Sequence, residues 1–170
     1  MAAPDLLDRL YDAHTPALYA FLLNLTRDEE DTRDLLQEIF LKMAREPSLL
    51  AGVGNERAFL LRMARNAVVD LVRRRQVHRH KHESLAANAE PLFVQSPDPD
   101  TRALREALSA ALAELPLEQR EIVHLKLWED LTFEGIASLL GIPLNTAASR
   151  YRYALDKMRG RLRLFHVEFK

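Results

Sequence analysis

The chain has 170 residues, of which 48% are hydrophobic and 29% are charged, and its formal net charge is −1. This length suits one domain or two small ones, and the apolar content is enough for a packed core, which excludes a wholly disordered chain. The sequence contains no apolar run near the roughly 20 residues of a membrane span, no secretory signal and no cysteine for disulfides. We therefore expect a soluble, cytoplasmic protein with no membrane contact of its own.

Charge is distributed in four blocks. Residues 1–56 and 83–140 each hold eleven acidic residues, against five and four basic ones. Residues 57–82 hold eight basic residues against one acidic, and residues 141–170 hold seven against two. Two basic blocks in acidic surroundings indicate two separate contacts with a polyanion, and the acidic blocks suit a basic protein surface. Solvated helix faces are the alternative explanation.

Apolar residues recur at helical spacing in the first part of the chain. The ranges predicted to be helical are 6–25, 29–45 and 56–77. Asp28 is expected to cap the second helix, Pro16 to kink or restart the first, and residues 47–55 to form a loop. The side chains expected to face the core are Leu6, Leu7, Leu10, Tyr11, Leu18, Phe21, Leu22, Leu25, Leu35, Leu36, Ile39, Phe40, Met43, Phe59, Leu60, Met63, Ala67 and Leu71.

The helical period disappears between residues 78 and 101, where HRHKH is followed by the proline-rich SPDPDT. Such a composition predicts a flexible linker. Helical patterns return afterwards over residues 102–114, 116–128, 132–140 and about 144–164. We therefore predict an all-α protein of two small helical domains, residues 1–77 and 102–170, joined by a linker over residues 78–101.

The stretch LTFEGIASLLGIPLNTAASRYRY predicts a helix-turn-helix in the second domain. Gly141 permits the positive φ of a sharp turn, Ile142 is expected to be buried in the turn, and the small Ala137 lets the two helices cross closely. One broad polar face of the second helix suits the DNA major groove. Its residues are Asn145, Thr146, Ser149, Arg150, Arg152 and Tyr153. A tight helical hairpin without DNA binding is the alternative.

The second basic block lies on the helix with MARNAVVDLVRRR. One stripe of that helix carries Arg62, Asn66, Val69 and Arg73, with Arg65 nearby. Arginine and asparagine hold phosphates or base edges, and Phe59 near the helix start suits either stacking on an unpaired base or a place in the core. The three arginines 73–75 at the helix end also favour the helix dipole.

The segment DLLQEIF places Asp34, Gln37 and Glu38 on one helix face, opposite an apolar face. As a bare pattern this is an ordinary amphipathic helix.

These pieces, in this order, resemble the extracytoplasmic-function (ECF) sigma factors, which are small bacterial RNA polymerase initiation factors. The resemblance is carried by DLLQE-x-F, by ARN-x-x-x-D-x-x-RRR and by LP-x-x-QRE followed by GIP and T-x-x-SR. It implies a protein that binds core RNA polymerase and directs promoter recognition and melting, with an anti-sigma factor as a further partner.

The resemblance also implies a role for each surface. The face of Asp34, Gln37 and Glu38 would dock on the basic clamp coiled coil of the polymerase large subunit. Base capture from the melted −10 element would fall to Phe59, Arg62, Arg65, Asn66 and Arg73. The polar face of the last helix would read the −35 element as duplex. Four positions depart from the family pattern. A tryptophan common after DLLQE-x-F is replaced near Met43 and Ala44, and Phe59 stands where a second tryptophan is usual. Gly135 replaces an acidic residue that would complete a capping box with Thr132, and Ala148 replaces a basic residue.

The alternatives come from other classes of protein. An enzyme has little support, because His78, His80 and His82 have poor metal-binding spacing and no nucleophile or phosphate cradle is visible. No catalytic residue, metal or cofactor is therefore expected. A stand-alone helix-turn-helix regulator that binds duplex operator DNA is the main rival, although it would need neither the DLLQE helix nor a second basic helix. An adaptor built on helical bundles is the third possibility.

Overall fold

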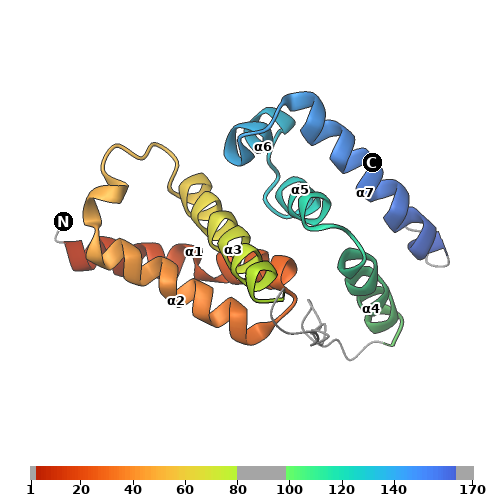
Figure 1. Cartoon of the computed structure of the whole chain (residues 1–170), viewed down its shortest axis with the longest axis horizontal. Helices are drawn as coiled ribbons and strands as arrows, with labels where there is room; N and C mark the ends of the chain where they lie inside the picture. Colours follow the sequence, from red (N-terminus) through yellow and green to blue (C-terminus); the bar gives the residue numbers. More distant parts are fainter. Residues whose placement is uncertain (1–2, 80–98, 164–170) are drawn as a thin grey trace. The chain divides into compact units, whose positions relative to one another are not determined.

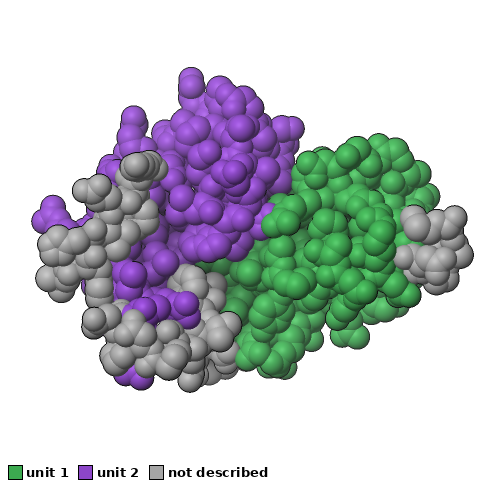
Figure 2. Space-filling view, turned by 180° about the vertical axis from the view of Figure 1, so that it is seen from behind, with its two compact units in different colours: residues 1–88 green, residues 89–170 purple. Residues whose placement is uncertain are grey.

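The computed structural model describes residues 3–79 and 99–163, and in these ranges every regular element is a helix (Figure 1). The chain divides into two compact units, residues 1–88 (unit 1) and 89–170 (unit 2), which Figure 2 colours separately. The predicted all-α class with two helical bodies is confirmed. Most of the predicted linker lies outside the described residues, but its two ends are helical, since the flanking helices extend to Arg79 and begin at Pro99.

Unit 1 is built from three long helices, α1 (Ala3–Thr26), α2 (Glu29–Arg45) and α3 (Glu56–Arg79), with a short 3-10 helix η1 (Pro47–Leu50) after α2. Each of the long helices contacts the other two. Their shared core consists of Leu10, Leu18, Phe21, Leu22, Leu25, Leu35, Leu36, Ile39, Phe40, Met43, Leu60, Leu61, Ala64 and Val68. Burial of these leucines and aromatics drives the packing of the unit.

The first helix runs without interruption through Pro16. The expectation that Pro16 restarts the helix is therefore wrong. A proline removes one backbone hydrogen bond, here to the carbonyl of Asp12. Both Pro16 and Asp12 are exposed, so water can reach that carbonyl, and the penalty is small enough for the packing of the two flanking helical segments to offset it.

The buried faces of α1 and α3 differ in part from the predicted ones. In α3, Leu61, Ala64 and Val68 join Leu60 in the core, whereas the predicted Phe59, Met63, Ala67 and Leu71 are half-buried. The reason is that apolar residues occur on most sides of this helix, so periodicity alone does not select the face that meets α1 and α2. Tyr11 was also expected to face inward but is 49% exposed.

The corner between α1 and α2 is held by local hydrogen bonds. Arg27 adopts a left-handed conformation with φ +58°, which reverses the chain after α1. Asp28 then caps α2 as predicted, since its carboxylate accepts the N–H of Asp31 at 2.8 Å. The hydroxyl of Thr32 donates to the Asp28 carbonyl at 2.7 Å. This corner fixes the direction in which α2 leaves α1.

Unit 2 contains α4 (Pro99–Ala113), α5 (Leu117–Leu127), α6 (Phe133–Leu140) and α7 (Leu144–Leu162). The long α7 contacts all three other helices, and α5 also contacts α6 (Figure 1). The largest fully buried side chains of this unit are Leu112, Ile122, Leu125, Ile136 and Met158. Arg161 of α7 forms an ion pair with Glu114 at the end of α4, with its Nε 2.8 Å from the carboxylate. Thus α7 is fastened by apolar packing along its length and by charge at its carboxyl end.

Candidate nucleic-acid interface

The turn between α6 and α7 has the predicted helix-turn-helix geometry. Gly141 ends α6 with φ +66°, a left-handed conformation in which a β-carbon is strained. The N–H of Ile142 then bonds the Ala137 carbonyl at 3.0 Å. Ile142 is half-buried rather than buried. At the other end of α6, Thr132 accepts the N–H of Gly135 at 3.1 Å, so the cap forms without an acidic side chain at that position.

Packing between α6 and α7 sets their crossing. The ring of Phe133 meets Tyr151 edge-on, with 5.5 Å between centroids and 65° between planes. Lys126, from the end of α5, lies 5.3 Å over the Phe133 ring and donates to the Leu131 carbonyl at 3.0 Å. Burial raises the pKa of the Tyr151 hydroxyl, as expected for a phenol inside a packed interface. This cluster holds the amino-terminal half of α7 in place.

The six predicted residues lie on the outer face of α7 and differ in their solvent exposure. Asn145, Arg152 and Tyr153 are exposed, whereas Thr146, Ser149 and Arg150 are half-buried. The opposite face is buried through Ala147, Tyr151, Ala154, Leu155, Met158 and Leu162. Ser149 donates to the Thr146 carbonyl at 3.1 Å, and the Arg152 guanidinium lies 5.4 Å from the Tyr153 ring centroid. A helix with one polar face and one buried face is the kind of element that a DNA major groove admits.

The outer face of α3 combines an aromatic ring with cationic and amide groups. Phe59 is half-buried, and the Arg62 guanidinium lies 5.8 Å from its ring centroid. Asn66 is exposed one turn further along, and Arg65 is half-buried at the side of this stripe. The four core residues of α3 lie on the opposite side. A half-buried ring beside a guanidinium suits an unpaired base, which can stack on the ring and hydrogen-bond to the guanidinium.

The three arginines at the end of α3 have different environments. Arg75 pairs with Asp31 of α2 at 2.7 Å, and the Asp31 side chain is only 13% exposed. Arg73 lies 3.8 Å from Asp70, with both side chains largely exposed. Arg74 forms no ion pair within the described ranges. Arg75 therefore has a structural role, while Arg73 and Arg74 point their charge to solvent.

Asp34, Gln37 and Glu38 lie together on the exposed face of α2. They line a shallow hollow of about 460 Å³ with Leu41, Lys42, Arg45 and Glu46. Across residues 3–79 and 99–163, neither Asp34 nor Glu38 forms an ion pair, so both carboxylates are available to a partner. Asp34, Gln37 and Glu38 therefore share one face of α2, as their spacing predicts.

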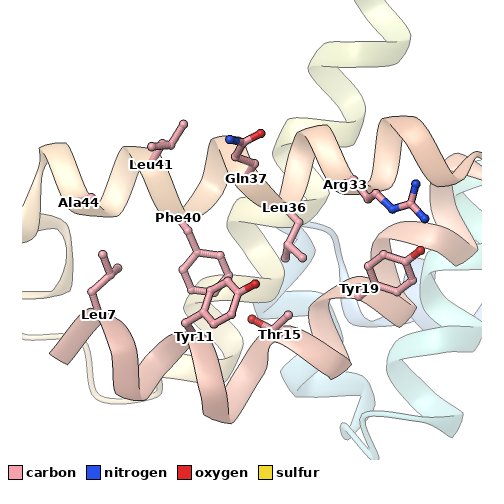
Figure 3. A pocket seen from close by; sticks show the side chains of 10 residues that line it. All are labelled: Leu7, Tyr11, Thr15, Tyr19, Arg33, Leu36, Gln37, Phe40, Leu41 and Ala44. Atoms are coloured by element: carbon pink, nitrogen blue, oxygen red, sulfur yellow. The ribbon is translucent and has the colours of Figure 1, made fainter. Parts of the chain in front are cut away.

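A second hollow, between α1 and α2, was not expected from the sequence (Figure 3). It measures about 620 Å³ and is lined by Leu7, Tyr11, Thr15, Tyr19, Arg33, Leu36, Gln37, Phe40, Leu41 and Ala44. We call it the α1–α2 groove. Tyr11 and Phe40 project toward each other across it, with ring centroids 4.9 Å apart. Leu41, which is 44% exposed, interrupts the polar face of α2 at the edge of this groove.

The described residues contain neither a helix long and apolar enough to cross a membrane nor a group of three side chains suited to hold a metal ion. The three histidines of the predicted linker, His78, His80 and His82, lie outside the described side chains.

A basic helix-turn-helix in one helical unit, together with a second unit that exposes a basic helix and an acidic one, defines a DNA-binding transcription protein. Comparison with known families is more specific. Residues 10–77 match the family model of Sigma-70 region 2, and residues 105–158 match that of Sigma-70 region 4. The first match falls in unit 1 and the second in unit 2.

Curated relatives cover nearly the whole chain. The ECF RNA polymerase sigma factor SigL of Mycobacterium tuberculosis is 32% identical over 160 residues, which are 93% of this chain and 89% of the relative. SigX of Bacillus subtilis, also an ECF sigma factor, is 24% identical over 164 residues, or 94% of this chain and 84% of the relative. The chain belongs to the ECF RNA polymerase sigma factors. This is a family of transcription initiation factors rather than of enzymes.

A solved structure has the same fold. It is the sigma factor RpoE of Bartonella quintana, crystallised in complex with the anti-sigma factor NepR. The TM-score is 0.72 at 23% identity, and the likeness covers 92% of this chain and 96% of that one.

Proposed function

We propose that this sigma factor binds core RNA polymerase through unit 1 and places both units on one promoter, unit 1 on the −10 element and unit 2 on the −35 element. The division of labour follows residues 1–77 and 102–170, with 78–101 as the tether. The observation that carries the proposal is that each unit exposes a separate basic helix face, α3 in unit 1 and α7 in unit 2, in a chain that matches sigma factors over both units.

The polymerase-binding surface is the acidic face of α2. Asp34, Gln37 and Glu38 present two carboxylates and an amide to a basic coiled coil of the polymerase. Gln37 and Leu41 line both this hollow and the α1–α2 groove, so the two are adjacent. The groove accepts an apolar side chain of the docked helix while the carboxylates at its rim pair with basic groups. Apolar burial then supplies affinity, and charge supplies orientation.

On α3, the −10 element is read after strand separation. Phe59 stacks on an extruded base, Arg62 and Asn66 bond its edge or the adjacent phosphates, and Arg65 and Arg73 bind the backbone. Unstacking a base costs a few kcal/mol, and stacking on Phe59 offsets part of that cost. Phe59 is half-buried and lies on the side of α3 opposite its four core residues, which supports this role over a place in the core.

On α7, the −35 element is read as duplex. Asn145, Thr146 and Ser149 stand in the first two turns, where a recognition helix meets base edges. Arg150, Arg152 and Tyr153 follow, and they bind bases or phosphates along the groove.

Its site of action is the cytoplasm, where RNA polymerase works, and an anti-sigma factor restrains it by covering the surfaces described above. The support for this partner is the family, together with the complex of the Bartonella quintana sigma factor with NepR.

Run-off transcription with core polymerase tests the proposal. The chain with core should start transcription at a discrete promoter recovered from a random duplex library, whereas the chain alone should not shift that duplex. A gel shift by the chain alone, with no effect on transcription by core, would instead identify a stand-alone regulator.

A further inference from the structure

The chain enters α3 through an exposed loop, residues 51–55, whose end is tightly fixed. Asn55 accepts the N–H of Ala58 on its side-chain oxygen at 2.9 Å and the N–H of Phe59 on its carbonyl at 3.1 Å. Gly52 takes a left-handed conformation with φ +75°. The orientation of the first turn of α3, and with it the place of Phe59, therefore depends on what holds this end of the helix.

An ion pair from α1 holds it. Arg9 donates to both carboxylate oxygens of Glu56, the first residue of α3, at 2.6 and 3.0 Å. His14 of α1 also faces that carboxylate, with its Nε2 3.9 Å away. The hydrogen bonds from Arg9 hold the pKa of Glu56 below its ordinary value. Two parallel bonds fix direction as well as distance, which a single contact does not.

The held residue stands next to the base-reading face. Phe59 follows Glu56 by three residues and therefore lies almost one helical turn above it, and Arg62 follows by another three. The side chains of Arg9 and Glu56 are 45% and 34% exposed, so their pairing adds little to the stability of the unit. Because the Arg9–Glu56 pair adds little stability, its main effect is on the position of the first turn of α3 and of Phe59.

We propose that Arg9 and Glu56 are positioning residues for −10 recognition: their bidentate pair sets the entry angle of α3, so that Phe59 and Arg62 are aligned to capture the unpaired base. This inference rests on the proposed role of α3. Neither residue touches DNA in the proposal, and both act through Phe59 and Arg62.

The test uses holoenzyme reconstituted from the full chain and bacterial core polymerase, on a promoter that the wild-type holoenzyme selects from a random duplex library. The probes are heteroduplexes with an unpaired −10 stretch, with each base in turn at each unpaired position. Arg9→Met, Glu56→Gln and the double variant should each bind the cognate probe about two- to fivefold more weakly. The ratio of their affinity for the cognate base to that for the other three bases should fall by the same factor, while core affinity stays unchanged and the melting temperature falls only slightly.

The double variant tests whether Arg9 and Glu56 act through the same contact. If they do, removing either residue already breaks that contact, and removing the second adds no further loss. The loss in the double variant should equal that of the weaker-binding single variant, and additive losses would overturn the proposal. Asp31→Asn is the matched control, because it removes an interhelical charge partner at the other end of α3. The control should leave base preference unchanged. If Asp31→Asn weakened base preference as much as Arg9→Met does, the effect would come from general loosening of α3, and the positioning role would be overturned.

Phe59→Ala separates the two proposals. If Phe59→Ala leaves probe binding unchanged, the assignment of α3 to the −10 element fails, and the positioning role fails with it. If Phe59→Ala weakens binding while Arg9→Met and Glu56→Gln do not, only the positioning role is overturned.

Discussion

The two basic helices, α3 and α7, are held in place in different ways. Interhelical ion pairs fasten α3 at both ends, from Glu56 to Arg9 of α1 and from Arg75 to Asp31 of α2. By contrast, α7 has such a pair at its carboxyl end, from Arg161 to Glu114, and its amino end is set by the Gly141 turn and the Phe133–Tyr151 contact. Basic residues therefore serve two purposes, and a count of charge overstates the charge available to DNA. Arg75 of α3 and Arg161 of α7 are held by carboxylates of other helices, whereas within the described ranges Arg62, Arg74 and Arg152 form no ion pair.

The largest effect should come from reversing charge on the acidic face of α2, which we propose docks on core polymerase. Asp34→Lys with Glu38→Lys should weaken binding to core polymerase about 100-fold, because like charges then face each other across the interface. Both side chains are exposed, so the melting temperature should hold.

The matched control for this reversal is Glu106→Lys with Glu118→Lys, two exposed carboxylates of unit 2. A pull-down with core polymerase compares the two double variants. Equal affinity for both would contradict the assignment of the α2 face.

For α7, the contrast between its two halves can be tested directly. Arg150→Ala should lower transcription from a −35-dependent promoter about tenfold, the value of one good groove contact. Ser149→Ala should cost less, because its hydroxyl already donates to the Thr146 carbonyl. Arg159→Ala is the control, since Arg159 lies in the carboxyl half and pairs with Asp156 at 3.1 Å. Equal losses in both halves, or losses independent of the −35 sequence, would point to misfolding instead.

The role of the Gly141 turn in placing the amino-terminal half of α7 can also be tested. Gly141→Ala should destabilise unit 2 by about 1 kcal/mol, because φ +66° is unfavourable for a residue with a β-carbon although the surrounding space is open. Gly160→Ala, inside α7 and equally open, should stabilise it by up to ~1 kcal/mol through helix propensity. Urea unfolding measures both, and shifts of the same sign would contradict the strain at Gly141.

The smallest effect should be the pH dependence of the α3 anchor. Because the pKa of Glu56 is lowered from 4.5 in the folded state, the stabilisation is fully present above that pH and is lost as the pH falls through the lowered pKa. The difference in unfolding free energy between the wild type and Glu56→Gln should therefore shrink as the pH falls from 6 to 3. Urea midpoints across this range give the measurement, and a constant deficit would show that Glu56 has no shifted pKa.

Sequence patterns predicted the elements that depend on local chemistry. The buried face of α2 was correct because its apolar residues occupy a single stripe, and the Asp28 cap and the Gly141 turn were correct because each depends on one residue type. The buried face of α3 was wrong in part because leucine, alanine and valine surround that helix. Contacts between distant residues had no sequence signal at all, such as Arg9 with Glu56, 47 residues apart, and Arg75 with Asp31, 44 apart. The α1–α2 groove likewise depends on helix spacing, which periodicity does not encode.

The double fastening of α3 has a consequence for how such proteins diversify. The fully buried residues of this helix are Leu60, Leu61, Ala64 and Val68, and both of its ends carry interhelical ion pairs, so its exposed side chains Arg62, Asn66 and Arg73 lie outside the core. Under the proposed role of α3, substitutions at these exposed positions should change which bases are preferred while the melting temperature of unit 1 changes little.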